Sequence, residues 1–261
     1  LDQVAKDLYG RFFSYEGGGD GGGTVFKCTQ KSLASMYGCD EKDLDSTVVA
    51  QLNVSLDSPE AYDQQKYLKD RFEKEGFTLF KTVYPETDYS SLKPELRKRQ
   101  GQLVHLVFKV DESKTKSSRE QFLRRITVQF NIGQQLGNMK GKVSSPADMM
   151  VSDIDRDNGV NIMAKCFQGG QLTQFFPYSL KLTITQKDVH LRQTTNTDVK
   201  RSSIHPTPNY GLTTMHNGEV NNIERLFHWM IGNQGFKDFL GFNAEKSDLV
   251  SILKGYSDTY L

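Results

Sequence analysis

The amino-acid sequence predicts an α+β fold, with an antiparallel β-sheet or sandwich of about six to eight strands, a flanking helix and a helical C-terminal region. Two stretches, residues 48–56 and 126–132, alternate apolar and polar side chains. Successive side chains of a strand point to opposite faces, so each stretch is expected to bury one face and expose the other. Strands of a parallel α/β core are instead apolar without interruption, so this alternation favours antiparallel sheet.

Composition and charge narrow the function classes. The chain has 261 residues, 11% aromatic residues and a net charge of +1. The aromatic content is higher than is typical of a disordered chain. The net charge gives no overall attraction to nucleic acid or to an anionic membrane. No run approaches the roughly 18 apolar residues of a membrane span. Cys28, Cys39 and Cys166 are expected to be free thiols in a reducing, intracellular compartment, with a single Cys28–Cys39 bridge as the alternative.

The N-terminal part is expected to hold a short helix, a connector and a strand. Apolar residues recur at a spacing of four within residues 1–15. The run Gly17–Gly23 contains six glycines, which lose much backbone entropy on ordering, so it is interpreted as a flexible connector. A strand over Thr24–Cys28 and a short helix holding Leu33 and Met36 follow.

The strand at 48–56 leads into a helix over residues 58–75. Asp57 and Pro59 indicate the helix start, because a capping side chain and a proline in the first turn both suit a helix N-terminus. Gly76 is expected to end the helix.

Further strands are expected at Phe77–Tyr84 and Gln102–Val110, separated by a basic helical segment, Ser90–Gln100. The buried face of the second strand is expected to carry Val104, Leu106, Phe108 and Val110. Its other face would carry His105 and Lys109 and point to solvent.

The second half is expected to place strands between long irregular segments. The expected strands are Ile126–Ile132, Val160–Phe167 and Tyr178–Gln186, the last with Leu180 facing inward. Residues 133–158 show no clear period and are expected to be irregular.

The chain divides into four predicted parts. Residues 1–23 form the N-terminal helix and connector, and residues 24–192 form a β-rich core domain. Residues 193–218, rich in Thr, Ser, Asn and Pro, are interpreted as a linker or long loop. Residues 219–261 are expected to be helical, because apolar residues recur there at helical spacing.

An acidic cluster is the sharpest candidate metal site. Asp153, Asp155 and Asp157 stand at alternate positions, as do the first oxygen ligands of a calcium loop. The pattern then breaks, because the positions that need Gly and Glu hold Asn158 and Ala164. An acidic turn before a strand is the favoured interpretation, and a metal-dependent hydrolase is the weaker alternative.

No cofactor is expected from the sequence. Gly17–Gly23 is not followed by the Lys-Ser/Thr of a phosphate-binding loop, and a strand is expected after it where a dinucleotide site needs a helix. The five histidines form no metal-binding pair, so we expect each to be a surface or hydrogen-bonded residue.

A basic segment is the candidate nucleic-acid interface. Ten basic and four acidic residues lie from Leu92 to Arg125, whereas seven acidic residues and one lysine lie from Tyr37 to Asp63. The candidate phosphate-binding residues are Lys93, Arg97, Lys98, Arg99, Lys109, Arg124 and Arg125. Outward aromatic residues for base stacking are missing, which favours pairing of the two segments within the chain or between subunits.

The sequence therefore predicts a non-enzymatic binding or assembly subunit that presents a sheet face and long loops to a macromolecular partner. A protein partner or self-association is expected, and an RNA- or single-stranded-DNA-binding domain is the alternative. This hypothesis depends on the absence of a recognisable catalytic set or cofactor motif.

Overall fold

The computed structural model describes residues 21–54, 60–111, 116–139, 148–154, 157–167, 172–191, 204–210 and 212–215, together with residues 113, 225, 229 and 232–235. The expected helix within residues 1–15, the helix start at Asp57–Pro59 and most of the expected C-terminal helical region lie outside these residues.

The described residues form short helices and antiparallel strands. The strands are β1 (Gly22–Cys28), β2 (Thr47–Val54), β3 (Phe77–Val83), β4 (Gln102–Val110), β5 (Asp148–Ile154), β6 (Val160–Cys166), β7 (Ile184–Leu191), β8 (Thr207–Asn209) and β9 (Leu212–Thr214). The α-helices are α2 (Gln30–Tyr37), α3 (Glu60–Lys74), α4 (Pro94–Gln100), α5 (Lys116–Met139) and α6 (Leu172–Phe175). The 3-10 helices are η1 (Glu41–Leu44), η2 (Tyr89–Ser91) and η4 (Pro177–Lys181).

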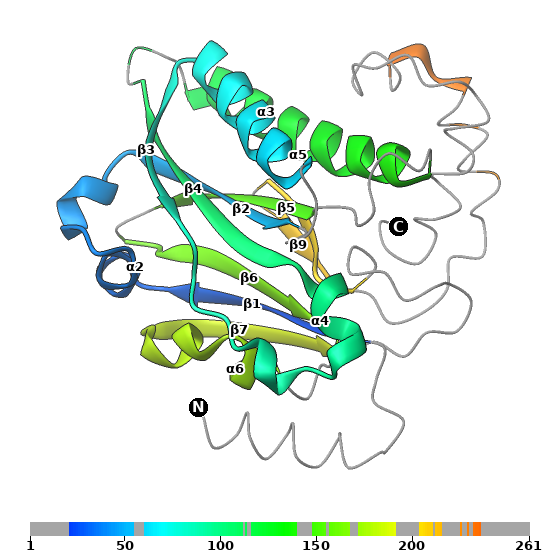
Figure 1. Cartoon of the computed structure of the whole chain (residues 1–261). Coiled ribbons are helices and arrows are strands. Elements are labelled where there is room, and N and C mark those ends of the chain that lie inside the picture. Colours follow the sequence, from blue (N-terminus) through cyan, green and yellow to red (C-terminus); the bar gives the residue numbers. More distant parts are fainter. Residues whose placement is uncertain are drawn as a thin grey trace.

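The strands make two main sheets, which confirms the predicted α+β class. One sheet has the order β6-β1-β7 and the other β3-β4-β2-β5, and β8 and β9 form a small ribbon. All strand pairs are antiparallel. Helices α3 and α5 lie side by side over the four-stranded sheet, and the three-stranded sheet lies on the side away from them (Figure 1). No helix of the described part is long and apolar enough to cross a membrane.

The helix-side face of the four-stranded sheet is apolar. Val48, Ala50, Val104 and Phe108 are fully buried on this face. The ring of Phe108 stacks on that of Phe72 from α3, with ring centroids 4.3 Å apart. The predicted burial of Phe108 is confirmed, and this layer anchors both long helices to the sheet.

The opposite face of the same sheet is buried as well, so the prediction of a wet face is wrong. Gln51 and His105 are fully buried between the two sheets. The amide of Gln51 donates to the carbonyl of Asn161 (2.7 Å) and accepts from the N–H of Met163 (2.8 Å). Asn161 and Met163 lie on the edge strand β6, whose outer backbone groups need partners. The polar side chain of Gln51 can therefore face the interior, because its hydrogen bonds are made to β6 between the two sheets.

Gln100 repeats this arrangement further along β6. Its amide donates to the carbonyl of Lys165 (2.6 Å) and accepts from the N–H of Phe167 (3.0 Å). Asn131 does the same for the other sheet, pairing with both backbone groups of Met149 on the edge strand β5. Amide side chains therefore cover two sheet edges that would otherwise be open to pairing with another chain.

The predicted strand Ile126–Ile132 is part of the long helix α5, so this prediction is wrong. Leu123, Ile126 and Phe130 are buried and recur at the helical spacing of three and four residues. The hydroxyl of Thr127 donates to the carbonyl of Leu123 one turn earlier (2.7 Å), which also suits a helix. Residues 126–132 by themselves fit both the period of a strand and that of a helix. The apolar residues before them, such as Leu123, extend the helical spacing and favour the helix.

The prediction that residues 133–158 are irregular is wrong for residues 133–139 and 148–154. Helix α5 continues to Met139, and Asp148–Ile154 forms strand β5 beside β2. Met149, Met150 and Val151 are consecutive and all buried, because both faces of β5 are covered. A strand of this kind shows no alternation in the sequence.

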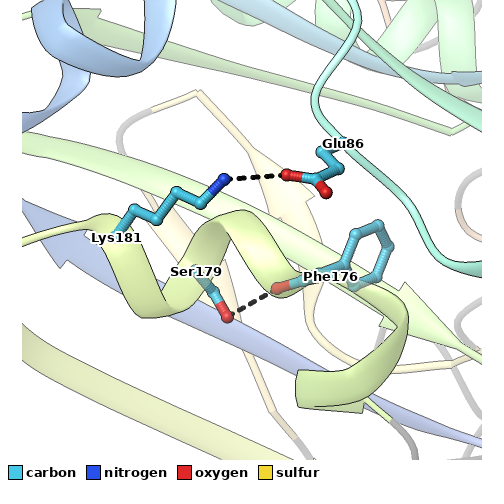
Figure 2. A network of polar contacts seen from close by, with 4 residues as sticks. All are labelled: Glu86, Phe176, Ser179 and Lys181. Carbon is cyan, nitrogen blue, oxygen red and sulfur yellow. Dashed lines mark hydrogen bonds and ion pairs between the residues drawn. The ribbon is translucent and has the colours of Figure 1, made fainter.

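The expected strand Tyr178–Gln186 begins later than predicted. Residues Pro177–Lys181 form η4, in which the Ser179 hydroxyl donates to the Phe176 carbonyl at 2.7 Å (Figure 2). Strand β7 starts only at Ile184. Lys181 pairs with Glu86 at 2.9 Å on the surface (Figure 2). Leu180 is exposed instead of inward, because the 3-10 turn rotates it away from the core.

The end of the glycine run belongs to a strand. Gly22 and Gly23 are the first residues of β1. A Cβ atom on Gly23 would lie 1.8 Å from the carbonyl oxygen of His205, so no other residue fits there without a shift. Glycine at this position therefore allows a close approach of two backbones, and the interpretation as a connector is wrong for this part of the run.

Candidate functional site

A cluster of reactive side chains lies between the two sheets. It consists of the thiol of Cys28, the phenols of Tyr37 and Tyr178 and the imidazole of His105, each at most 3% exposed. The Tyr37 hydroxyl lies 2.7 Å from Nδ1 of His105. The two rings meet edge to face, with centroids 5.7 Å apart. We call these four residues the inter-sheet cluster.

Local structure explains why these side chains point to one another. Cys28 is the last residue of β1, and Thr29 caps α2 by accepting a hydrogen bond from the N–H of Ser32. Leu33 and Tyr37 are one turn apart on the buried face of α2. The helix therefore begins beside Cys28 and carries Tyr37 back into the core.

The cluster is uncharged at neutral pH. Burial raises the pKa of the Cys28 thiol to about 12, and a hydrogen bond with Ser32 only partly opposes this effect. Burial also lowers the pKa of His105 to about 3, so its imidazole is neutral. The pKa values of Tyr37 and Tyr178 are raised, first by burial and then by the nearby Cys28. A buried group without a counter-ion is expected to stay neutral.

The cluster contains the parts of a nucleophilic site. A thiol can attack a carbonyl carbon once it has lost its proton, and a neutral imidazole can accept that proton. Nε2 of His105 and the hydroxyl of Tyr178 have no hydrogen-bond partner among the described residues. Buried polar atoms of this kind call for a partner such as water or a bound molecule.

The other two cysteines have different surroundings, and all three are free. Cys39 lies partly exposed just beyond α2, and its thiol pKa is raised mainly by partial burial, against the lowering effect of Lys81. Cys166 is buried opposite Gly22, at the other end of the β1–β6 pair from Cys28. The two buried thiols are thus about 20 Å apart along the strand.

The predicted phosphate-binding residues do not form one surface. Lys93 and Arg97 belong to the start of α4, whereas Lys109 lies at the far end of β4, roughly 20 Å along the strand from α4. Arg97 donates to the carbonyl of Leu92, and Lys109 lies 4.8 Å from the centre of the Phe80 ring.

The remaining basic residues lie on α5 and near the end of α4. Arg124 and Arg125 are exposed on α5, and Arg125 pairs with Glu75 at 3.9 Å. The side chains of Lys98 and Arg99 lie outside the described residues.

The described aspartates of the predicted metal site have different surroundings. Asp153, exposed near the end of β5, accepts a hydrogen bond from the Tyr210 hydroxyl. Asp157 is exposed, and Asp155 lies outside the described residues. Within the part of the chain that the structure describes, no three His, Cys, Asp or Glu side chains are grouped to hold a metal. Metal binding at these aspartates stays an untested prediction.

Sequence reasoning missed the inter-sheet cluster. It assigned His105 to an exposed face, did not name Tyr37 and treated Tyr178 as a core residue that begins a strand. The signal for Tyr37 was present, because Leu33 and Tyr37 share a helical stripe. The burial of His105 was not visible locally, since it depends on the second sheet.

Comparison with known proteins corrects the functional prediction. The family model for class-II glutamine amidotransferases matches residues 10–259. A comparison with curated proteins gives no match. Glutamine amidotransferases are enzymes, so the predictions of a non-enzymatic binding, structural or assembly role and of RNA or other nucleic-acid binding are wrong. By a match that covers nearly its whole length, the chain belongs to the family of class-II glutamine amidotransferases.

Proposed function

We propose that the chain cleaves the side-chain carboxamide of glutamine and passes the released nitrogen to an acceptor. The observation that carries this proposal is the family match over residues 10–259. In such a reaction a nucleophile attacks the amide carbon and ammonia leaves. Water then cleaves the acyl-enzyme, so glutamine and water give glutamate and ammonia.

Cys28 is our candidate nucleophile, on the evidence of its neighbours. It acts electrostatically on both phenols, Tyr37 and Tyr178, and the Tyr37 hydroxyl in turn meets the imidazole of His105. In the described conformation its thiol is protonated, because burial raises its pKa to about 12. His105 would accept the proton through the Tyr37 hydroxyl, which lies 2.7 Å from its Nδ1. Because Cys28 is fully buried, glutamine would reach it only after the packing around the cluster opens.

The activity is tested by incubating the purified chain with glutamine and measuring glutamate and ammonia. We expect both products in equal amounts from the wild type. Absence of both over many hours, in a chain shown to be folded, would contradict the proposed activity.

The nucleophile is tested separately. We expect Cys28→Ala to abolish product formation, whereas Cys166→Ala, a matched buried thiol in the same core, should keep it. A glutamine chloroketone, which alkylates the attacking atom, should modify the peptide that contains Cys28. Alkylation of another residue would place the nucleophile elsewhere and leave the activity proposal intact.

His105→Gln tests the base. Removing a general base typically costs about 10²–10⁴-fold in rate. We expect a loss of this size in the rate of the alkylation step as well as in turnover, with little change in glutamine affinity. Unchanged rates in a folded variant would exclude His105 from this role.

The partner and the compartment are further proposals. An acceptor site for ammonia on a protein partner or on a second copy of the chain would complete the transfer. A reducing, intracellular location is supported by the three free cysteines.

A further inference from the structure

We propose that a cavity on the helix side of the four-stranded sheet binds a free α-amino acid in its zwitterionic form. The cavity lies where α3 ends, β3 begins and β4 ends, against the first turns of α5. It has a volume of about 70 Å³, and it adjoins a wider surface groove with which it shares Phe77, Val110 and Asp111. This site is distinct from the inter-sheet cluster and does not depend on the proposed activity.

The lining carries charges of both signs. Glu75 and Asp111 contribute carboxylates, and Arg119 contributes a guanidinium. Nε of Arg119 is buried without a hydrogen-bond partner among the described residues. A buried donor of this kind favours a ligand that brings an acceptor, and a carboxylate fits the planar guanidinium best.

The carboxylates offer several acceptor sites. Asp111 accepts a hydrogen bond from the N–H of Ser113 (2.9 Å), among other interactions, and an ionised carboxylate has about four acceptor sites. Glu75 pairs with Arg125 at 3.9 Å, an exposed contact that contributes little. An ammonium group would therefore find acceptors beside the guanidinium.

Charge balance decides the class of ligand. A simple anion would be attracted by Arg119 but repelled by the two carboxylates. A simple cation would be attracted by the carboxylates but repelled by Arg119. A zwitterion pairs each of its charges with the opposite sign. The remaining wall is apolar: Phe77 and Phe122 have ring centroids 5.5 Å apart, and Val110 lies beside them. This wall suits an unbranched aliphatic side chain.

The site and the inter-sheet cluster lie on opposite faces of one sheet. Phe77 and Phe122 belong to the helix-side core, whereas His105 and Cys28 lie between the sheets. Amino-acid binding here is therefore separate from amide cleavage at Cys28.

The test is titration calorimetry of the full chain with L-norvaline, which has both charges, a propyl side chain and no carboxamide to cleave. Pentanoate and pentylamine each lack one of the charges. We expect norvaline to bind at least about tenfold more tightly than either, because a charge-assisted hydrogen bond is lost in each case. Equal binding of the three compounds, or no binding of norvaline at 10 mM (about the weakest useful affinity), would overturn the proposal.

Variants locate the site. Arg119→Gln and Asp111→Asn are each expected to weaken norvaline binding at least about tenfold. Arg124→Gln changes an exposed residue of the same helix that does not line the cavity, and it should leave binding unchanged. Arg119 also acts electrostatically on Tyr210, so the Asp111 variant provides the test if Arg119→Gln unfolds. Cys28→Ala should keep binding, and tight binding by both site variants would contradict the proposal.

Discussion

The two faces of the four-stranded sheet are both buried, but they are built differently. The helix-side face holds stacked and interlocking apolar side chains from α3, α5 and the strands, such as Phe72 and Phe108. The inter-sheet face mixes apolar residues with Gln51, which is hydrogen-bonded to β6, and with His105, whose Nδ1 meets the hydroxyl of Tyr37. The first face holds the fold together by packing, and the second holds the residues of the proposed nucleophilic site. In this proposal, stability and chemistry are divided between the faces of one sheet.

The largest expected effect is the removal of the central aromatic side chain from the helix-side face. Phe108→Ala should lower the free energy of unfolding by about 3–5 kcal/mol, because it leaves a cavity between Phe72 and the sheet. Urea denaturation followed by circular dichroism measures this loss. A loss below about 1 kcal/mol would show that this face is not the main packing layer.

A smaller effect is expected when the polar pair of the other face is broken. Tyr37→Phe removes the hydroxyl that meets Nδ1 of His105 and leaves that nitrogen buried without its partner. We expect a loss of about 1–3 kcal/mol in the free energy of unfolding. Combining it with His105→Leu should recover part of the loss, as a double-mutant cycle would show. Strictly additive losses would mean that the two groups are not coupled.

The same histidine should make stability depend on pH. The pKa of His105 is lowered to about 3 in the folded chain, from 6.5 when it is unperturbed. Between these values the unfolded chain binds more protons, so the free energy of unfolding falls as the pH falls from 6.5 toward 3. This histidine should contribute up to about 1.4 kcal/mol for each pH unit in that window. Unfolding curves of the wild type and of His105→Gln over this range should differ by that slope, and parallel pH profiles would contradict it.

The smallest effect is expected at the surface. Lys181→Ala removes the ion pair with Glu86, whose side chains are both mostly exposed. We expect a change of about 0–1 kcal/mol in the free energy of unfolding, because exposed ion pairs are screened by solvent. Thermal unfolding at low and high salt measures it. A change as large as that of Tyr37→Phe would mean that η4 depends on this pair for its position.

The sequence determined much of the framework by local rules. The strands at β2, β3, β4 and β6 and the helix α3 lie close to where the periodicity predicted them. The stop at Gly76 is confirmed by its positive φ of 87°, which glycine adopts without strain. The α+β class follows from these elements, because each depends on side chains a few residues apart.

Only the tertiary structure decided which sheet faces are exposed to solvent and which distant residues are in contact. The alternation in β4 is real, but its polar face is covered by a second sheet, so His105 lies in the core and not in solvent. Ile126 and Phe130, which fit a strand as well as a helix, share one buried cluster with α3 and the four-stranded sheet, and the seven-residue window alone could not show this. The inter-sheet cluster joins residues up to 150 positions apart, from Cys28 to Tyr178. Periodicity reports only on neighbours in the chain, whereas burial and contact between distant residues arise when the layers pack together.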